Sequence, residues 1–404
     1  MTATLPLPAA SAPTADGTTT PGVAAESTTT RIAGIDLARL VAVVGMIVMH
    51  TAGAMTTTWY AHLAHGRSAI LFCTLAGVGL ALISGGAPRP KGRMAGIRRS
   101  VAVRGLVLAL TGLALASLPH NYISIVLVTY AVLFWAAIPL LRAGARTLWT
   151  ITLTGAAALP VVTMFLARRF PVDPADLGSH VAQTPILQDL WHPDRWDTVA
   201  TLTLIGGSYP ALVWVPVALA GIAAVRSGWL TRPGRMLAAG VAGMVAGYGG
   251  AWLTAGPLGL RADGQFNEMT GEVDQALPAE AWHALFAATP HSGSIAEIVG
   301  AVGVAFTVLA LCLVAMRLPL RRALAPLAAA GSLPLSIYIG HVVVISRMEV
   351  GSTMTLRFMG LLIAGCIAAA WLWQRFLGRG PAERVLTAAG NLAAGKRPRL
   401  LARR

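Results

Sequence analysis

The sequence predicts an all-α fold, a polytopic membrane helix bundle with about ten transmembrane helices. Of its 404 residues, 55% are hydrophobic and only 12% are charged, whereas soluble domains contain roughly 25% charged residues. The apolar residues are gathered into runs of about 20, which as helices can cross a hydrocarbon layer roughly 30 Å thick. Each run should be helical, because lipid offers no hydrogen-bond partner to an open backbone.

The predicted spans lie between two tails of different composition. Residues 1–30 are almost uncharged and rich in Thr, Ala, Ser and Pro, which predicts a disordered N-terminal tail rather than a signal peptide. Residues 378–404 form a basic tail that looks unstructured, so the transmembrane domain is expected at 31–377. Its apolar runs cover residues 33–52, 68–86, 101–118, 122–141, 148–167, 198–225, 236–255, 294–316, 325–346 and 355–374.

Basic residues collect in every second connection between the predicted spans, beginning with the one after the second span. Arg and Lys mark the cytoplasmic side, so this alternation places both termini in the cytoplasm and indicates the plasma (inner) membrane. The two long acidic connections, 168–197 and 256–293, should face outward. The formal net charge of +15 thus reflects topology, and no nucleic acid is expected as a partner because no basic stripe with interleaved aromatic residues is present.

Several classes of chemistry have no support in the sequence. It contains no Gly-rich phosphate loop, no serine nucleophile elbow and no CxxC pair, which argues against nucleotide hydrolysis, serine hydrolysis and thiol redox chemistry. The three cysteines, Cys73, Cys312 and Cys366, lie inside apolar runs and are expected to pack there. The pair His62 and His65 has no third ligand nearby, so no metal is expected.

Ionisable residues inside a membrane span are costly, so each is a functional candidate. In the first span, the stretch IDLARLVAVVGMIVMH places Asp36 and Arg39 near the cytoplasmic end and His50 near the outer end. The step from Arg39 to His50 amounts to about three full turns, so the two side chains share a helix face at depths roughly 16 Å apart. The simpler alternative is that Asp36 and Arg39 only pair with each other and that His50 only ends the helix.

Further polar groups are expected at the outer level of the membrane. His291 and Glu297 begin the eighth predicted span, and His341 lies in the outer half of the ninth. Each alone is more commonly a packed or water-facing residue, but their convergence predicts a polar site. Gly and Pro residues interrupt two spans at 206–210 and 331–334, which predicts either broken helices beside a cavity or packing kinks.

The spacing of Arg39, ten intervening residues and His50 resembles the Arg-x10-His signature in the first helix of the acyltransferase family three membrane enzymes. The stretches HGRSAILFCTLAGVGLAL, GGSYPALVWVPVALAG, TPHSGSIAEIVGAVGVAF and GSLPLSIYIGH are similar to bacterial heparan-alpha-glucosaminide N-acetyltransferase-like proteins. Both groups belong to a proposed transmembrane acyltransferase superfamily. The resemblance implies transfer of an acyl group, expected to be acetyl, from cytoplasmic acyl-CoA to a sugar, glycan or glycolipid at the outer face.

The resemblance also implies roles for individual residues. The signature histidine corresponds to His50, whereas the histidine proposed for the animal heparan enzyme corresponds to His62 or His65, so His50 and His65 are the catalytic candidates. The residues expected to hold the phosphates of acyl-CoA are Arg39, Arg98, Arg99 and Arg104. The basic cluster among them also fits simple anchoring at the cytoplasmic side. The residues expected to bind the acceptor are Arg67, Tyr209, His291, Glu297 and His341.

Two other functions remain open on the sequence. The interrupted sixth span and the outer histidines also fit a membrane transporter or flippase with a proton-coupled outer histidine site. The chain could also be a superfamily member that has lost catalysis and serves in membrane assembly or sensing. For an acyltransferase, the choice of acceptor is expected to reside in the connections 168–197 and 256–293.

Overall fold

The computed structural model describes residues 32–52, 58–86, 94–119, 121–170, 184–259, 282–348 and 355–396. The chain divides into two units, Met1–Ile32 and Ala33–Arg404, and the helices described below belong to the second. Every regular element in the described ranges is a helix, which confirms the predicted all-α class. The tail predicted at 1–30 lies outside the described residues, as do 171–183 and 260–281 of the two predicted outer connections.

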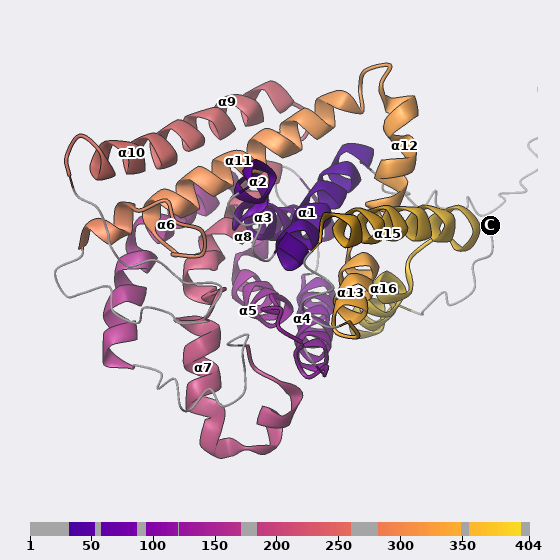
Figure 1. Ribbon diagram of the computed structural model, residues 1–404, viewed down its shortest axis with the longest axis horizontal. Coiled ribbons are helices and arrows are strands. Elements are labelled where there is room, and N and C mark those ends of the chain that lie inside the picture. Colours follow the sequence, from indigo (N-terminus) through magenta and orange to yellow (C-terminus); the bar gives the residue numbers. More distant parts are fainter. Residues whose placement is uncertain are drawn as a thin grey trace, which may run out of the picture. The chain divides into compact units, whose positions relative to one another are not determined.

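The helices follow one another along the chain as labelled in Figure 1. The long helices are α1 (Ala33–Ala52), α3 (Arg67–Ile83), α4 (Ala95–Ala116), α6 (Ala145–Arg169), α11 (Ile295–Ala315) and α15 (Leu356–Leu377). The shorter helices are α2 (Trp59–Ala64), α5 (Leu127–Ala137), α7 (Trp196–Leu204), α8 (Ala211–Arg226), α9 (Pro233–Met244), α10 (Gly250–Ala255), α12 (Arg321–Ala330), α13 (Pro334–Ile345) and α16 (Pro381–Ala393). The 3-10 turns are η2 (Pro139–Arg142), η4 (Leu187–Trp191), η5 (Pro193–Arg195) and η7 (Trp282–Phe286), and η6 (Val245–Gly249) is a π-helix between α9 and α10.

In the described ranges, seven helical segments are long and apolar enough to cross a membrane, and the count is eight if α12 and α13 form one bent span. The seven coincide with predicted runs, with α2 and α3 forming one span and α9, η6 and α10 another. The runs predicted at 122–141 and 198–225 overlap the shorter apolar helices α5 and α8. The helices therefore fit a multi-pass membrane protein, whereas the count of about ten and the orientation of the termini stay predictions.

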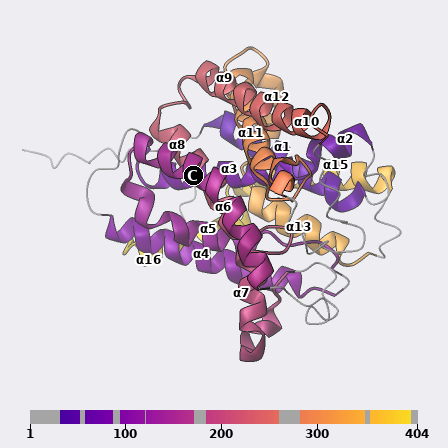
Figure 2. The same cartoon turned by 90° about the vertical axis from the view of Figure 1, so that its left-hand side faces the viewer.

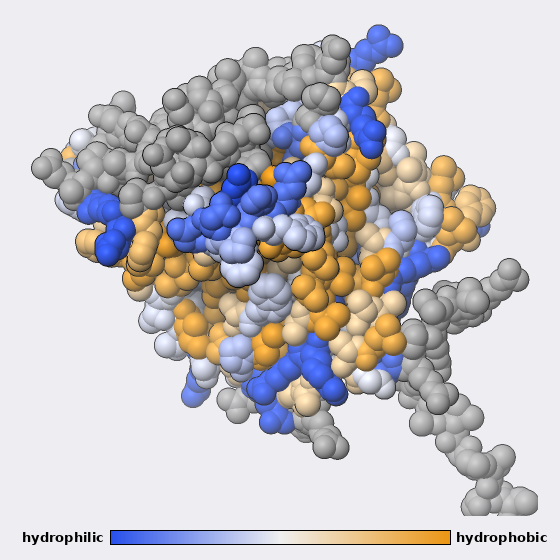
Figure 3. All heavy atoms as spheres, turned by 90° about the horizontal axis from the view of Figure 1, so that it is seen from below, coloured by the Kyte–Doolittle hydropathy of each residue, from blue (hydrophilic) through white to orange (hydrophobic). Residues whose placement is uncertain are grey.

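Large apolar side chains are exposed on the long helices, and Figure 3 shows wide apolar areas on one face of the described residues. Leu153 and Phe165 of α6, Val245 of η6 and Leu361 of α15 are between 59% and 67% exposed. Contiguous apolar surface of this extent is rare on soluble monomers, because water makes it costly. Hydrocarbon removes that cost, so these faces fit a lipid bilayer as the surrounding solvent.

The backbones of the helices α3 and α8 lie in direct contact. Gly77 of α3 faces the backbone of Ala218, and Gly221 of α8 faces the backbone of Thr74, so a Cβ at either glycine would collide with the other helix. Small residues let helices gain van der Waals contact where lipid provides no hydrophobic drive for association. The segment from α9 to α10 runs along α11 in a similar way (Figure 1).

Two predicted spans are broken where Gly and Pro residues interrupt them. Residues 205–210 separate α7 from α8, with Gly207 at a φ of 64° and Pro210 directly before the new helix. The helices α12 and α13 meet at 62° before Pro334. Positive φ suits glycine, and proline lacks the N–H that a continuous helix needs. In Figures 1 and 2, α7 points away from the other helices, and none of its residues is buried.

Part of the basic tail predicted at 378–404 is a docked helix, which corrects the expectation of an unstructured tail. The helix α16 begins after Gly380 and packs along α4. Ala382 and Leu386 pack against the core, and Gly390 is buried. These positions are four residues apart and lie on one face of the helix. The short apolar stripe was hidden by the basic composition around it.

Candidate functional site

His50, in the last turn of α1, forms a hydrogen bond with His341, in the middle of α13. The Nδ1 atom of His50 lies 2.9 Å from Nε2 of His341, and the two rings stack with centroids 5.2 Å apart. His341 is fully buried, whereas His50 is half-buried. The Nδ1 atom of His341 lies 3.1 Å from the carbonyl oxygen of Ile337, one turn earlier in α13. Two histidines 291 residues apart in the sequence are thus in contact.

These contacts determine which ring nitrogens carry protons when both histidines are neutral. A carbonyl oxygen only accepts, so the proton of His341 lies on Nδ1 and its Nε2 is an acceptor. His50 therefore donates from Nδ1, which leaves its Nε2 with a lone pair. Nε2 of His50 has no hydrogen-bond partner in the part of the chain that the structure describes. The pair thus presents an oriented nitrogen base.

The loop before α11 is organised by Glu297, whose side chain is buried. Its Oε1 accepts from the backbone N–H of His291 at 2.5 Å, and its Oε2 accepts from the N–H of Gly293 at 2.7 Å and the hydroxyl of Ser292 at 3.2 Å. Ser294 caps α11 by accepting from the N–H of Glu297 at 3.0 Å. These bonds hold His291 at a φ of 62°, a conformation that is uncommon for a residue with a side chain.

His291 also joins this loop to the break between α7 and α8. Its Nδ1 donates to the carbonyl oxygen of Ser208 at 3.1 Å, and its ring meets that of Tyr209 edge to face, with centroids 5.2 Å apart. The carbonyl oxygen of Tyr209 accepts from the hydroxyl of Thr129 at 2.8 Å, and the hydroxyls of Ser208 and Ser124 are 3.0 Å apart. Side chains thus provide the hydrogen bonds that the unwound segment does not make within a helix.

The beginning of α3 brings His65 and Arg67 to the same region. The rings of His65 and His291 have centroids 5.7 Å apart. The Nε of Arg67 donates to the hydroxyl of Tyr248 at 3.0 Å, its guanidinium lies 5.0 Å from the centre of that ring, and it also donates to the carbonyl oxygen of His62. Arg67 contacts no carboxylate in the described ranges. Tyr248 lies in the π-helix η6, and π turns are frequent at functional sites.

The structure therefore gathers most of the predicted site residues into one region of the bundle. Its members are His50, His65, Arg67, Tyr209, His291, Glu297 and His341. Tyr122 contacts the backbone of His50, and Ser124, two residues further along the chain, contacts Ser208 in the break that His291 joins to the loop before α11. The hydrogen bonds that Glu297 makes in the described ranges are to its own loop, whereas its Oε1 also lies close to Gly66 before α3. Catalysis and acceptor binding by these residues stay predictions.

The arginines predicted to bind acyl-CoA do not belong to this region. Arg39 pairs with Asp36 at 2.9 Å, so the local ion pair expected as the simpler alternative is present. Arg98 and Arg99 are exposed in the first turns of α4. Arg104, further along α4, lies half-buried against α16. None of these contacts tests the binding of acyl-CoA, which stays a prediction.

Three tyrosine and serine side chains of the region were not predicted from the sequence. The hydroxyl of Tyr122 donates to the carbonyl oxygen of His50 at 3.3 Å. Ser124 contacts Ser208 in the break before α8, and Tyr248 contacts Arg67. Single polar residues at helix ends carry no pattern that indicates such contacts. The loop before α11 does carry one, because Ser-x-x-Glu before an apolar run is a capping signature that assigns Glu297 to its own helix end.

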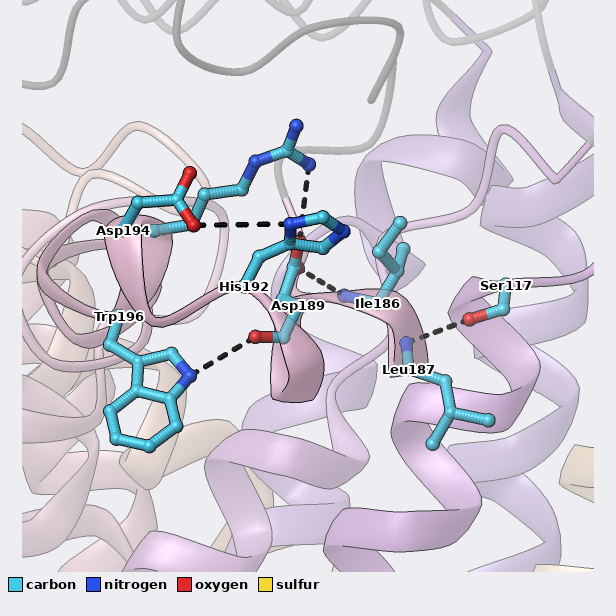
Figure 4. A network of polar contacts seen from close by, with 8 residues as sticks. Ser117, Ile186, Leu187, Asp189, His192, Asp194 and Trp196 are labelled. Carbon is cyan, nitrogen blue, oxygen red and sulfur yellow. Dashed lines mark hydrogen bonds and ion pairs between the residues drawn. The ribbon is translucent and has the colours of Figure 1, made fainter.

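The described part of the first predicted outer connection is held in place by Asp189 (Figure 4). Its buried carboxylate accepts from the N–H of Ile186 at 2.9 Å, and its carbonyl oxygen accepts from the indole N–H of Trp196 at 3.1 Å. The N–H of Leu187 donates to the hydroxyl of Ser117, just after α4, at 2.8 Å. The connection is thus fixed to the end of α4, and its role in choosing the acceptor stays a prediction.

Within the described ranges, no group of three or more His, Cys, Asp or Glu side chains is arranged to hold a metal ion. The three cysteines form no disulfide with one another, and Cys73 and Cys312 are buried among apolar side chains. Neither observation assigns a cofactor to the site.

A comparison with models of known protein families finds no match. A comparison with curated proteins finds no significant relative.

Proposed function

We propose that this chain is an enzyme of the plasma (inner) membrane that transfers an acyl group, expected to be acetyl, from cytoplasmic acyl-CoA to a sugar, glycan or glycolipid at the outer face. The observation that carries the proposal is the pair of His50 and His341, which leaves His50 Nε2 as an oriented base. The resemblance of Arg39 and His50 to the Arg-x10-His signature supports the same reaction.

In a direct route, His50 acts as a general base. Its Nε2 takes the proton from the acceptor hydroxyl or amine while the acceptor attacks the thioester carbonyl. The C–S bond breaks, and the CoA thiolate leaves and receives that proton. The imidazolium formed in between is stabilised because its Nδ1–H donates to His341. General base catalysis of this kind typically contributes about 10²- to 10⁴-fold.

In a relayed route, His50 Nε2 attacks the thioester itself and takes over the acyl group. The C–S bond breaks, and CoA leaves as a thiolate that takes a proton from water. The new C–N bond gives the ring a positive charge, and the proton on Nδ1 can pass to His341 Nε2, to which it is already hydrogen-bonded. The acceptor then attacks the acyl carbon and releases its proton to water, the C–N bond breaks, and the first proton returns to His50. Both routes require the same nitrogen.

The remaining members of the region fit acceptor binding. Sugar hydroxyls both donate and accept, and the imidazoles of His65 and His291 and the guanidinium of Arg67 offer complementary groups beside the ring of Tyr209. His65 is the second catalytic candidate, because it lies against His291. The CoA phosphates are assigned to Arg39 and to the basic cluster of α4, since guanidinium groups bind phosphate by paired hydrogen bonds.

A proton-coupled transporter or flippase is the second candidate function. The observation that favours it is the presence of two broken helix pairs, α7 with α8 and α12 with α13, the latter bent by 62°. Transporters bind substrates at such interruptions. The two functions differ in whether a covalent bond to the acceptor forms.

Acetyl transfer from radiolabelled acetyl-CoA tests the enzyme proposal. The purified protein in lipid nanodiscs is mixed with an extract of cell-envelope glycans, and label on the glycans is counted for wild type, His50→Gln, His65→Ala and Arg39→Ala. The matched control is His283→Gln, an outer histidine outside the site. We expect His50→Gln to lose about 10²-fold or more in rate while the control retains it.

The outcomes separate the candidates. Loss in His65→Ala alone, with His50→Gln fully active and folded, would move catalysis to His65. Loss in Arg39→Ala through a raised KM for acetyl-CoA supports donor binding by that residue. No transfer by wild type with several glycan extracts contradicts the enzyme proposal and favours transport.

A further inference from the structure

The beginning of α13 is capped by a carboxylate from another helix. α13 starts at Pro334, and Leu333 before it has no side chain that can accept a hydrogen bond. Glu383 of α16 fills this position, because its Oε1 accepts from the N–H groups of Leu335 at 2.8 Å and Ser336 at 3.1 Å. The first N–H groups of a helix have no partner within it, and a negative charge is favourable there. The C-terminal helix thus completes the end of α13.

The junction is reciprocal. The hydroxyl of Ser336 donates to Oε2 of Glu383 at 2.5 Å and accepts from the N–H of Ala382 at 3.2 Å, so each helix end caps the other. Gly380 permits the approach, because a Cβ there would collide with the side chains of Ser336 and Leu333. The two helix ends therefore meet in one defined arrangement.

The other part of α13 carries His341, five residues after Ser336. A helix rises roughly 7.5 Å over that distance, so the first turn lies close to the histidine on the same continuous helix. α12 does not hold this turn in line, since it meets α13 at 62°. The position of His341 relative to His50 therefore depends on what holds the beginning of α13.

α16 is itself anchored away from α13. Gly390 packs against Ser100 and Arg104 of α4, and Gly96 of α4 faces the backbone of Ala394 just after α16. The contact with α4 extends along the helix beyond its first turn. Glu383 thus connects α13 to a helix whose position is set by α4.

We infer that α16 is a latch whose docking sets the alignment of His341 with His50, and that Glu383 is the positioning residue of this latch. Without the carboxylate, the N–H groups of Leu335 and Ser336 lose their acceptor and the first turn of α13 is released. His341 then moves from His50, whose Nε2 loses its fixed direction. The inference rests on the proposed function through His50, but it concerns contacts outside the reaction site.

The test compares Glu383→Leu with Val385→Ala, an exposed position of the same helix, in lipid nanodiscs. Leucine has no acceptor for the N–H groups of Leu335 and Ser336 and no charge. The first readout is the rate at which diethyl pyrocarbonate modifies His50, followed by mass spectrometry. The second is acetyl transfer. For Glu383→Leu we expect His50 modification to change at least about threefold and kcat to fall about 10- to 100-fold, with KM for acetyl-CoA nearly unchanged.

A folded Glu383→Leu protein with wild-type reactivity of His50 overturns the latch. If that variant does not fold, Glu383→Asp serves in its place, because it keeps the charge but draws the carboxylate back by one methylene from the N–H groups of Leu335 and Ser336. In that variant we expect a smaller change in the same direction, and no change in His50 reactivity rejects the latch. If wild type transfers no acetyl group, His50 reactivity still decides the latch, so its failure and that of the proposed function are distinguishable.

Discussion

Replacing His341 tests whether this buried residue orients His50. His341→Leu removes the acceptor of the 2.9 Å hydrogen bond and leaves Nδ1 of His50 without a partner. An unpaired polar group in such a place costs about 1–3 kcal/mol. His50 can avoid that cost by changing rotamer or tautomer, and since each 1.36 kcal/mol of barrier corresponds to tenfold in rate, about 5- to 150-fold of kcat should be lost.

His341→Gln is the matched variant, because its amide oxygen can accept from Nδ1 of His50. If orientation is the function of His341, this variant should stay within about tenfold of wild type. If His341 must also take a proton, as in the relayed route, glutamine should be as poor as leucine. The assay is acetyl transfer at saturating acetyl-CoA in nanodiscs, with thermal unfolding to confirm the fold. A folded His341→Leu protein with the wild-type kcat would refute the reasoning.

Three further predictions concern stability, each measured as thermal unfolding in detergent. Gly221→Leu should lower the free energy of unfolding by about 1–3 kcal/mol or more, because the leucine side chain meets the backbone of α3. Gly360→Ala, with open space around it, should be neutral or slightly stabilising. Equal effects of the two changes would contradict the packing of α8 on α3. Arg226→Met should cost about 1–3 kcal/mol, because this buried residue donates to two backbone carbonyls and one hydroxyl; an unchanged midpoint would show that those acceptors find other partners. Ser294→Ala should lower the free energy of unfolding by about 1 kcal/mol, because α11 loses its N-terminal cap. A folded variant should also transfer acetyl more slowly, because the loop of His291 loosens. Unchanged stability would argue against the cap.

The positions of the helices were largely predictable, because a chain that crosses lipid must satisfy its backbone hydrogen bonds within a helix. Apolar runs of sufficient length become helices, and Gly and Pro residues at 206–210 and 331–334 marked both breaks. Hydropathy does not show how far a break shortens the helix beside it, so α8 is shorter than the run that predicted it. α16 escaped prediction because its apolar face consists of a few positions spaced by four within a basic segment.

The members of the site could be predicted better than their contacts. Histidines at the outer level were candidates because a polar group in a span is costly, and this holds without knowledge of neighbouring helices. The bond between His50 and His341 depends on how α1 and α13 lie together, and no spacing in the sequence encodes it. The pairing of Arg39 with Asp36 was predictable, because it needs only the geometry of one helix.

Acetyl transfer across a sealed membrane tests the proposed reaction most directly. Proteoliposomes enclose cell-envelope glycans, and radiolabelled acetyl-CoA is added outside to molecules whose cytoplasmic side faces outward. The acyltransferase proposal predicts that label accumulates on the enclosed glycans and that His50→Gln reduces the rate about 10²-fold or more. Enclosed glycans that stay unlabelled with the folded wild-type protein, or that cross the membrane without an acetyl group, would contradict it.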